Sequence, residues 1–345
     1  MKYRVLCLDI LNIAMRIVLV LLFAALSLTL YGAVAAYIIS LFIASAFAFH
    51  YFSKVMPARP PGNLGYRFRS MASFSLPTSL ARVLSSGSGI VETIILGYFV
   101  VAEQVGIYTV AMKIAAIGAI VLMSLNMVFS PLISQLYAQE RKGELRELYK
   151  VVTRWAFSLS LPVYMLIAWY STPIATLFGQ EYSAGAGVIV ILCGGQLINA
   201  LTGPSGILLL MSGHSITTLW INFAGLVLTV VLSVILIPEY GIVGCAVAVA
   251  SAVATMNIVR VVLAGVFIRM QPYDMGYWKP LVAAVLSLVL LGVWGPGRES
   301  SVEVLALLMA MGIGLIVYGA ALLILGLNQA DRYVLAKIGQ RFVGR

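Results

Sequence analysis

Apolar stretches of about 20 residues recur along the 345-residue chain, and short polar segments separate them. A helix of this length crosses the roughly 30 Å hydrocarbon core of a bilayer, whereas the alternating ten-residue strands of a membrane barrel are absent. The pattern therefore predicts an all-α, polytopic bundle of about ten membrane-spanning helices. Their approximate bounds are 13–31, 33–53, 76–99, 107–134, 152–171, 186–209, 216–237, 242–268, 279–295 and 303–326.

Composition agrees with this pattern. Hydrophobic residues make up 62% of the chain, charged residues only 10%, and the mean hydropathy is +1.04. Soluble domains contain about 25% charged residues, so the chain reads as an integral membrane protein. The net charge of +10 lies in short clusters between apolar runs, which indicates membrane topology and excludes nucleic acid as a partner. Cys7, Cys193 and Cys245 are far apart and read as small core residues, with no metal or cofactor site implied.

The loop charges predict the orientation. If the N-terminus is cytoplasmic, the basic residues of the loops lie inside, acidic residues dominate outside, and Arg298 is the only base in the outside loops. Both termini are then cytoplasmic, in the cell (inner or plasma) membrane. The inside basic residues are Lys2, Arg4, Lys54, Arg59, Arg67, Arg69, Arg141, Lys142, Arg146, Lys150, Arg154, Arg269, Lys279, Arg332, Lys337, Arg341 and Arg345. A cleaved signal peptide is the less favoured alternative for the first helix, because the apolar run continues to Phe52.

An internal repeat predicts the domain organisation. LYGAVAAY (Leu30–Tyr37) and EYGIVGCAVAV (Glu239–Val249) each lie between two apolar runs, and duplication is common in transporters. Its register makes the first hairpin the last third of an incomplete lobe, about four helices short. The predicted divisions are this hairpin at 1–55, a cytoplasmic linker at 56–74, a complete six-helix lobe at 75–269, an extra helix pair at 270–327 and a basic cytoplasmic tail at 328–345.

Two segments carry local signals. Gln135–Arg154 is charged and amphipathic, so it is either a short helix on the cytoplasmic surface or a plain linker. Pro162 and the sequence Gly203–Gly206 interrupt apolar spans, and we expect kinks or hinges there.

Charged residues within apolar spans mark the candidate site. Charge at membrane depth costs at least about 2.5 kcal/mol on insertion scales, so it normally faces the interior of a bundle. Glu92 and Lys113 lie at nearly equal depth on either side of the turn near Glu103, so they could form a structural ion pair or line a polar cavity. Arg82 lies deeper, level with Asn126, which we expect to be its hydrogen-bonding neighbour.

Several segments together resemble the polysaccharide flippases (the Wzx-type O-antigen and teichoic-acid exporters) of the multidrug/oligosaccharidyl-lipid/polysaccharide exporter superfamily. This MATE-like resemblance covers essentially the whole chain and is best from Phe74 to Arg269. The matching segments are Phe74–Leu80, Glu92–Ala115, Ser130–Lys150, Ala175–Gly195 and Ile237–Ala248. It implies two six-helix lobes around a central cavity, of which the first four helices are not in this chain. It also implies non-enzymatic, alternating-access transport of a polyprenyl-pyrophosphate-linked glycan from the inner to the outer leaflet.

That cargo assigns roles to the charged residues. A pyrophosphate leaving water needs fixed cations with several hydrogen-bond donors, so Arg82 and Lys113 are the first candidates. Arg154 and Arg260 are weaker candidates, since interface anchoring explains them as well. Glu92 would offset Lys113 or carry a coupling proton. Asn199, Asn222 and Asn257 are interpreted as contacts between helices.

Three alternatives stay open. A drug or cation exporter of the same superfamily would need acidic cavity residues. A membrane enzyme of glycan assembly, such as a polymerase or glycosyltransferase, would need catalytic carboxylates near a large outside loop. The predicted outside loops are short, and the aspartates lie in inside segments or near the N-terminus, at Asp9, Asp274 and Asp331. A structural subunit would need the missing four-helix segment or another glycan-assembly protein as its partner.

Overall fold

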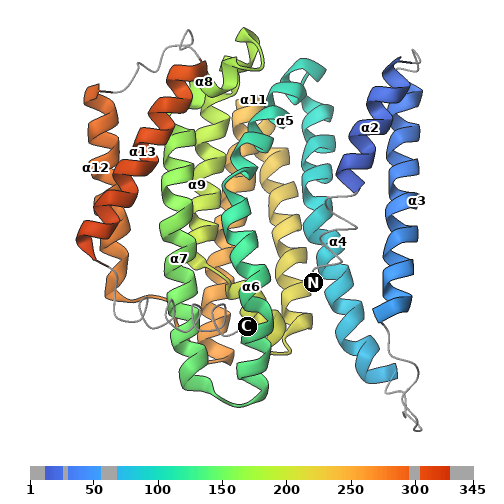
Figure 1. Ribbon diagram of the computed structural model, residues 1–345, viewed down its shortest axis with the longest axis vertical. Helices are drawn as coiled ribbons and strands as arrows, with labels where there is room; N and C mark the ends of the chain where they lie inside the picture. The colour runs from blue at the N-terminus through green and yellow to red at the C-terminus, as the bar shows by residue number, and fades with distance from the viewer. Residues whose placement is uncertain (1–11, 26–29, 56–67, 295–303, 327–345) are drawn as a thin grey trace. The chain divides into compact units, whose positions relative to one another are not determined.

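A computed structural model describes residues 12–25, 30–55, 68–294 and 304–326, and all regular structure in these ranges is helical (Figure 1). The contact pattern divides the chain into two compact units, residues 1–67 and 68–345. The predicted all-α membrane bundle is confirmed. Part of the predicted linker is helical, because the first helix of the second unit begins at Phe68.

The first unit contains a helical hairpin. Helix α2 (Asn12–Ala25) packs against α3 (Leu30–Val55). The guanidinium carbon of Arg16 lies 4.5 Å from the centre of the Tyr37 ring, so a cation–π contact joins the two helices. The sequence places Leu30–Tyr37 between the first two apolar runs. In the structure, Tyr31 and Gly32 of this segment lie in the first turn of α3.

The second unit contains the remaining helices. They are α4 (Phe68–Phe99), α5 (Ala102–Ala116), α6 (Ala119–Ala138), α7 (Lys142–Trp169), α8 (Ser171–Thr176), α9 (Ala186–Thr202), α10 (Ser205–Met211), α11 (Ser215–Phe267), α12 (Trp278–Trp294) and α13 (Val304–Leu325), with the 3₁₀ turns η2 (Gln180–Gly185) and η3 (Met275–Tyr277). Contacts run from α4 to α11, from α11 to α9, from α9 to α7, and from α7 to the α12–α13 pair. Figure 1 shows this succession across the unit.

Helix α11 contains two predicted spans. At 1.5 Å per residue its 53 residues would be about 80 Å long, far more than one bilayer crossing. Gly241 breaks it with φ +54° and ψ −133°, a backbone conformation that favours glycine. The two halves then pack side by side, since a Cβ on Gly225 would lie 2.9 Å from the Met256 side chain. The predicted turn around Glu239–Val249 is confirmed.

Seven helices in the described ranges are long and apolar enough to span a membrane, and α11 counts once among them. The first two predicted spans correspond to α2 (Asn12–Ala25) and α3 (Leu30–Val55), and α2 is shorter than its predicted span. The predicted span at 107–134 is divided at Ile117–Gly118, between α5 and α6. Here Gly118 lies so close to Tyr164 of α7 that a Cβ would be 2.4 Å from the tyrosine ring.

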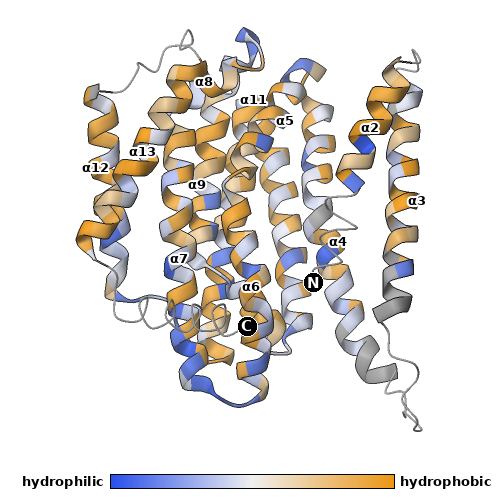
Figure 2. Cartoon of the chain, in the orientation of Figure 1, coloured by the Kyte–Doolittle hydropathy of each residue, from blue (hydrophilic) through white to orange (hydrophobic). Residues whose placement is uncertain are grey.

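Helix α7 corrects the prediction for Gln135–Arg154. Helix α6 continues to Ala138, a short turn follows, and the charged segment forms the first turns of α7. Figure 2 shows this hydrophilic end of α6 and α7 beside the apolar body of both helices. Leu145, Tyr149 and Val152 are buried, because they pack against α10 and α11 within the protein and not against a lipid surface.

The predicted break at Gly203 is confirmed, with φ +58° between α9 and α10. A Cβ there would lie 2.5 Å from the Thr153 hydroxyl, so only glycine fits. Pro162, in contrast, lies within a continuous α7. Cys193 and Cys245 are buried and unbridged, as expected of core residues, whereas Cys7 lies outside the described residues.

Candidate functional site

A polar cavity of about 190 Å³ lies between α4, α9 and the two halves of α11. Helix α4 contributes Ser85, Ser88 and Glu92, and α9 contributes Gln196 and Asn199. Helix α11 adds Asn222 and Thr229 from its first half and Asn257 and Arg260 from its second. Such a concentration of amides, hydroxyls and charges inside an apolar bundle is costly, which makes it a candidate binding site.

Arg260 is the cation of this cavity. One terminal nitrogen donates to Asn222 Oδ1 at 2.8 Å, and the other donates to Asn257 Oδ1 at 3.0 Å. Its Nε is buried and has no hydrogen-bond partner in the described ranges. No carboxylate in those ranges forms an ion pair with Arg260. A guanidinium has five N–H donors, so amide oxygens alone leave both charge and donors available to an anion.

Glu92 is the acid of the cavity. Its residue exposure is only 6%, and it forms no ion pair with any described residue. It lies on the same face of α4 as Ala81, Ser85 and Ser88, spaced at i, i+4, i+7 and i+11 from Ala81. This face packs against α11, and Glu92 lines the cavity.

The expected pairs of charged residues do not form. Lys113 is exposed on α5 and makes no ion pair with Glu92, although the two lie at similar depth, because they are on faces that do not meet. Arg82 is likewise exposed on α4, one position away from the buried face. No hydrogen bond joins it to Asn126, whose buried Oδ1 has no partner in the described part of the chain.

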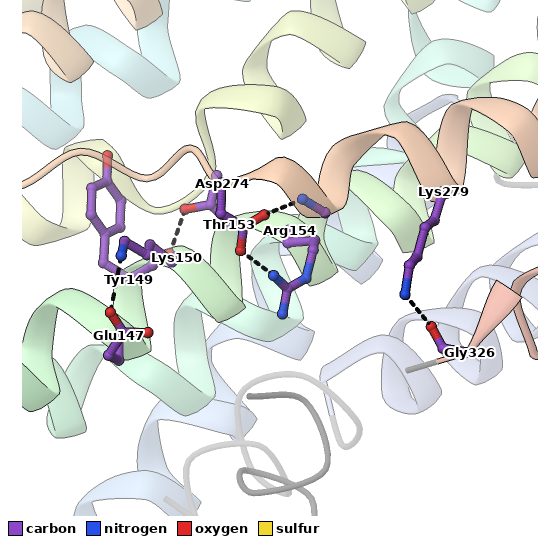
Figure 3. A network of polar contacts seen from close by, with 9 residues as sticks. Glu147, Tyr149, Lys150, Thr153, Arg154, Asp274, Lys279 and Gly326 are labelled. Atoms are coloured by element: carbon purple, nitrogen blue, oxygen red, sulfur yellow. Dashed lines mark hydrogen bonds and ion pairs between the residues drawn. The ribbon is translucent and has the colours of Figure 1, made fainter. Parts of the chain in front are cut away.

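Figure 3 shows the environment of Arg154, beside Asp274. Arg154 is 4% exposed, and its guanidinium forms an ion pair with Asp274, in the segment between α11 and α12. The second carboxylate oxygen of Asp274 accepts from the Gly276 N–H at 2.8 Å and so begins η3. This pair connects α7 to the connection that leads to the last two helices, which is a structural role. Arg154 does not line the cavity that contains Arg260.

Further polar contacts hold the last two helices in place. Tyr318 of α13 donates to the Ser158 carbonyl of α7 at 2.7 Å. Lys279 of α12 donates to the Gly326 carbonyl at 2.7 Å, also drawn in Figure 3. The α12–α13 pair is therefore fastened to α7, on the side of that helix away from the cavity-lining α4.

Sequence reasoning treated Asn222 and Asn257 as contacts between helices, and a stronger signal was available. Asn222 and Arg260 are each 19 residues from Gly241, the point at which α11 folds back. Residues at equal distance from such a turn lie at equal depth and can meet. Counting residues from the turn placed Glu92 and Lys113 at equal depth. The same count from Gly241 places Asn222 opposite Arg260, and these two side chains are hydrogen-bonded.

Two family profiles match the chain. The MatE family matches residues 77–235, and the family described as polysaccharide biosynthesis protein matches residues 1–137. These two matches together cover residues 1–235, and they show that the chain is similar to the multidrug/oligosaccharidyl-lipid/polysaccharide exporter superfamily. It is thus a multi-pass membrane protein, and the resemblance inferred from its sequence is confirmed.

Relatives of the chain have names from glycan biosynthesis. The chain is 24% identical over 203 residues to the probable low-salt glycan biosynthesis flippase Agl15 of Haloferax volcanii, covering 58% of this chain and 43% of that protein. It is 24% identical over 181 residues to the capsular polysaccharide biosynthesis protein CapF of Staphylococcus aureus, covering 52% and 46%. The teichuronic acid biosynthesis protein TuaB of Bacillus subtilis is 24% identical over 151 residues, covering 43% and 30%. The chain therefore spans less than half the length of these relatives.

A solved superfamily structure has the same fold. The lipid II flippase MurJ, in its inward closed conformation, superimposes with a TM-score of 0.65 at 14% identity. The match covers 97% of this chain and 68% of that protein.

Proposed function

We propose that this chain takes part in flipping a polyprenyl-pyrophosphate-linked oligosaccharide from the inner to the outer leaflet of the plasma membrane. The observation that carries the proposal is Arg260, a half-buried residue that lines a polar cavity and whose guanidinium is held by amide oxygens alone among the described residues. A diphosphate moved out of water needs such a cation with free donors. The flippase and polysaccharide-biosynthesis names of the relatives support the same substrate class.

The rest of the cavity lining suits a carbohydrate. Gln196, Asn199, Asn222 and Asn257 provide amide donors and acceptors, and the hydroxyls of Ser85 and Ser88 add more. Sugars present many hydroxyl groups, each of which both donates and accepts hydrogen bonds. Arg82 is exposed one turn before Ser85, so it is placed to meet the same ligand at the edge of the cavity. Lys113 and Asn126 lie outside the cavity, and we assign them no contact with the ligand there.

The predicted orientation of the chain in the membrane bears on the direction of transfer from the inner to the outer leaflet. With both termini cytoplasmic, Arg260 lies seven residues, or about 10 Å, from the inner end of α11 at Phe267. Glu92 lies seven residues from the outer end of α4 at Phe99. The cation is thus nearer the leaflet in which the cargo starts, and the acid is nearer the side to which it is delivered. The chain acts as a transporter and not as an enzyme.

A cation exporter of the same superfamily is the second candidate. Glu92 favours it, because a buried carboxylate without an ion pair in the described residues is suited to a cationic solute. The glycan substrate ranks first because Arg260 would repel such a solute from the same cavity.

Export in cells distinguishes the two candidates. The chain is expressed in a strain that lacks its own exporter of lipid-linked glycan, and surface glycan is quantified. Arg260→Gln should reduce export at least tenfold at equal membrane abundance, because charge-assisted hydrogen bonds to the diphosphate are lost. Arg260→Lys should retain part of it. Equal export by wild type and Arg260→Gln would contradict the glycan proposal, and Glu92-dependent resistance to cationic drugs would favour the alternative.

A further inference from the structure

Asn222 stands between two groups of fixed hydrogen-bonding character. Its Nδ2 donates to the Ala81 carbonyl of α4 at 2.9 Å, while its Oδ1 accepts from Arg260 at 2.8 Å. The Ala81 carbonyl can only accept and the Arg260 guanidinium can only donate. A side chain between them must therefore both donate and accept, and the asparagine amide does so with one group facing each neighbour.

Asn257 is bound in a contrasting way. Its Oδ1 also accepts from Arg260, at 3.0 Å, but its Nδ2 donates to the Val253 carbonyl of its own helix at 2.9 Å. Asn257 therefore fixes the guanidinium relative to α11 only. Asn222 is the one of these two amides whose contacts reach α4.

We propose that Asn222 is a positioning residue that couples anion binding at Arg260 to the position of α4 against α11. An anion that takes donors from the guanidinium competes with the Asn222 oxygen for the same nitrogen. When that contact weakens, the amide is released to turn, and its bond to the Ala81 carbonyl weakens with it. Ala81, Ser85, Ser88 and Glu92 share one face of α4, so a movement of α4 at Ala81 reshapes the cavity wall. This inference rests on the proposed function only in taking the ligand to be an anion.

The test measures binding and helix position in the same full-length protein. Inorganic pyrophosphate at constant ionic strength is the probe, and binding is followed by the rise in melting temperature in detergent. Helix position is followed by the distance between spin labels at Leu76→Cys on α4 and Ile216→Cys on α11, both exposed sites. Cys7 is replaced by serine, while Cys193 and Cys245 are buried.

The variants separate positioning from simple packing. Asn222→Leu should broaden the ligand-free distance distribution and remove its response to pyrophosphate. Asn222→Asp keeps the side-chain shape and pairs with Arg260, so the protein should fold but no longer gain stability from pyrophosphate. Asn257→Leu, the matched control, should keep the ligand-free distribution and still respond, with about tenfold weaker binding.

Each outcome decides the proposal. Asn222→Leu with the wild-type distribution in the absence of ligand, or with the wild-type response to pyrophosphate, would overturn it. So would a wild type that is stabilised by pyrophosphate without any change in the α4–α11 distance. A wild type that gains no stability from pyrophosphate contradicts the anion site of the proposed function instead. In that case, the ligand-free α4–α11 distance distributions of wild type and Asn222→Leu still show whether Asn222 fixes the position of α4.

Discussion

Arg154 and Arg260 lie in the same helical unit and have different kinds of partner. Arg154 is neutralised by Asp274, whereas Arg260 contacts only amide oxygens among the described residues. A buried charge with an opposite charge beside it is satisfied and holds elements together, while one held by neutral groups keeps its attraction for a ligand. This difference, and not burial alone, separates the structural arginine from the candidate binding arginine.

The structural role of Arg154 predicts a stability effect. Arg154→Ala should lower the free energy of unfolding by about 3 kcal/mol, the low end for a buried pair, because Asp274 is partly exposed. Arg141→Ala is the control, since the Arg141–Glu144 pair is exposed and should contribute less than about 1 kcal/mol. Thermal unfolding in one detergent compares them, and equal losses for the two variants would argue against the anchoring role.

The sequence predicted some of the residues that line the cavity and missed others. Glu92 and Arg260 were predicted as candidates and share the cavity, whereas Arg82, Lys113 and Asn126 do not line it. Depth was counted correctly, but depth does not fix which face of a helix is buried. The stripe of Ala81, Ser85, Ser88 and Glu92 shows that Arg82 falls one position outside the packed face of α4.

Close helix packing beside the cavity depends on small residues. A Cβ on Gly195 of α9 would lie 2.9 Å from the backbone and side chain of Ala250 on α11, whereas one on the neighbouring Gly194 would meet nothing within 4 Å. Gly195→Ala should therefore destabilise the protein by about 1–3 kcal/mol through overpacking. Gly194→Ala should be neutral or stabilise it by up to about 1 kcal/mol. Unfolding curves for both variants test the contact, which would be refuted if Gly195→Ala behaved like Gly194→Ala.

The elements themselves were largely predictable from the sequence. Apolar length located the spans, and the glycines at 203 and 241 marked the breaks, because their backbone angles are costly for other residues. The charged segment that forms the first turns of α7 was misassigned for a physical reason. An amphipathic helix has the same pattern whether its apolar face meets lipid or, as here, a neighbouring helix.

At the scale of the whole molecule, the polar cavity lies within the second, membrane-spanning unit. Four amides, one carboxylate and one guanidinium line a cavity between α4, α9 and α11, inside a helical bundle that is similar to the exporter superfamily. The side of the unit formed by α12 and α13 is fastened to α7 by polar contacts, so we expect movement at α4 and α11 to leave that side in place.

Leaflet transfer is the most direct test of the central claim. The purified chain is reconstituted into liposomes that carry a fluorescent polyprenyl-pyrophosphate-linked oligosaccharide, and a membrane-impermeant quencher reports its arrival in the outer leaflet. Wild type should transfer the lipid faster than protein-free liposomes, with Arg141→Gln unchanged and Arg260→Gln slowed at least tenfold. A wild-type rate no faster than that of protein-free liposomes, or an Arg260→Gln rate equal to wild type, would contradict the account.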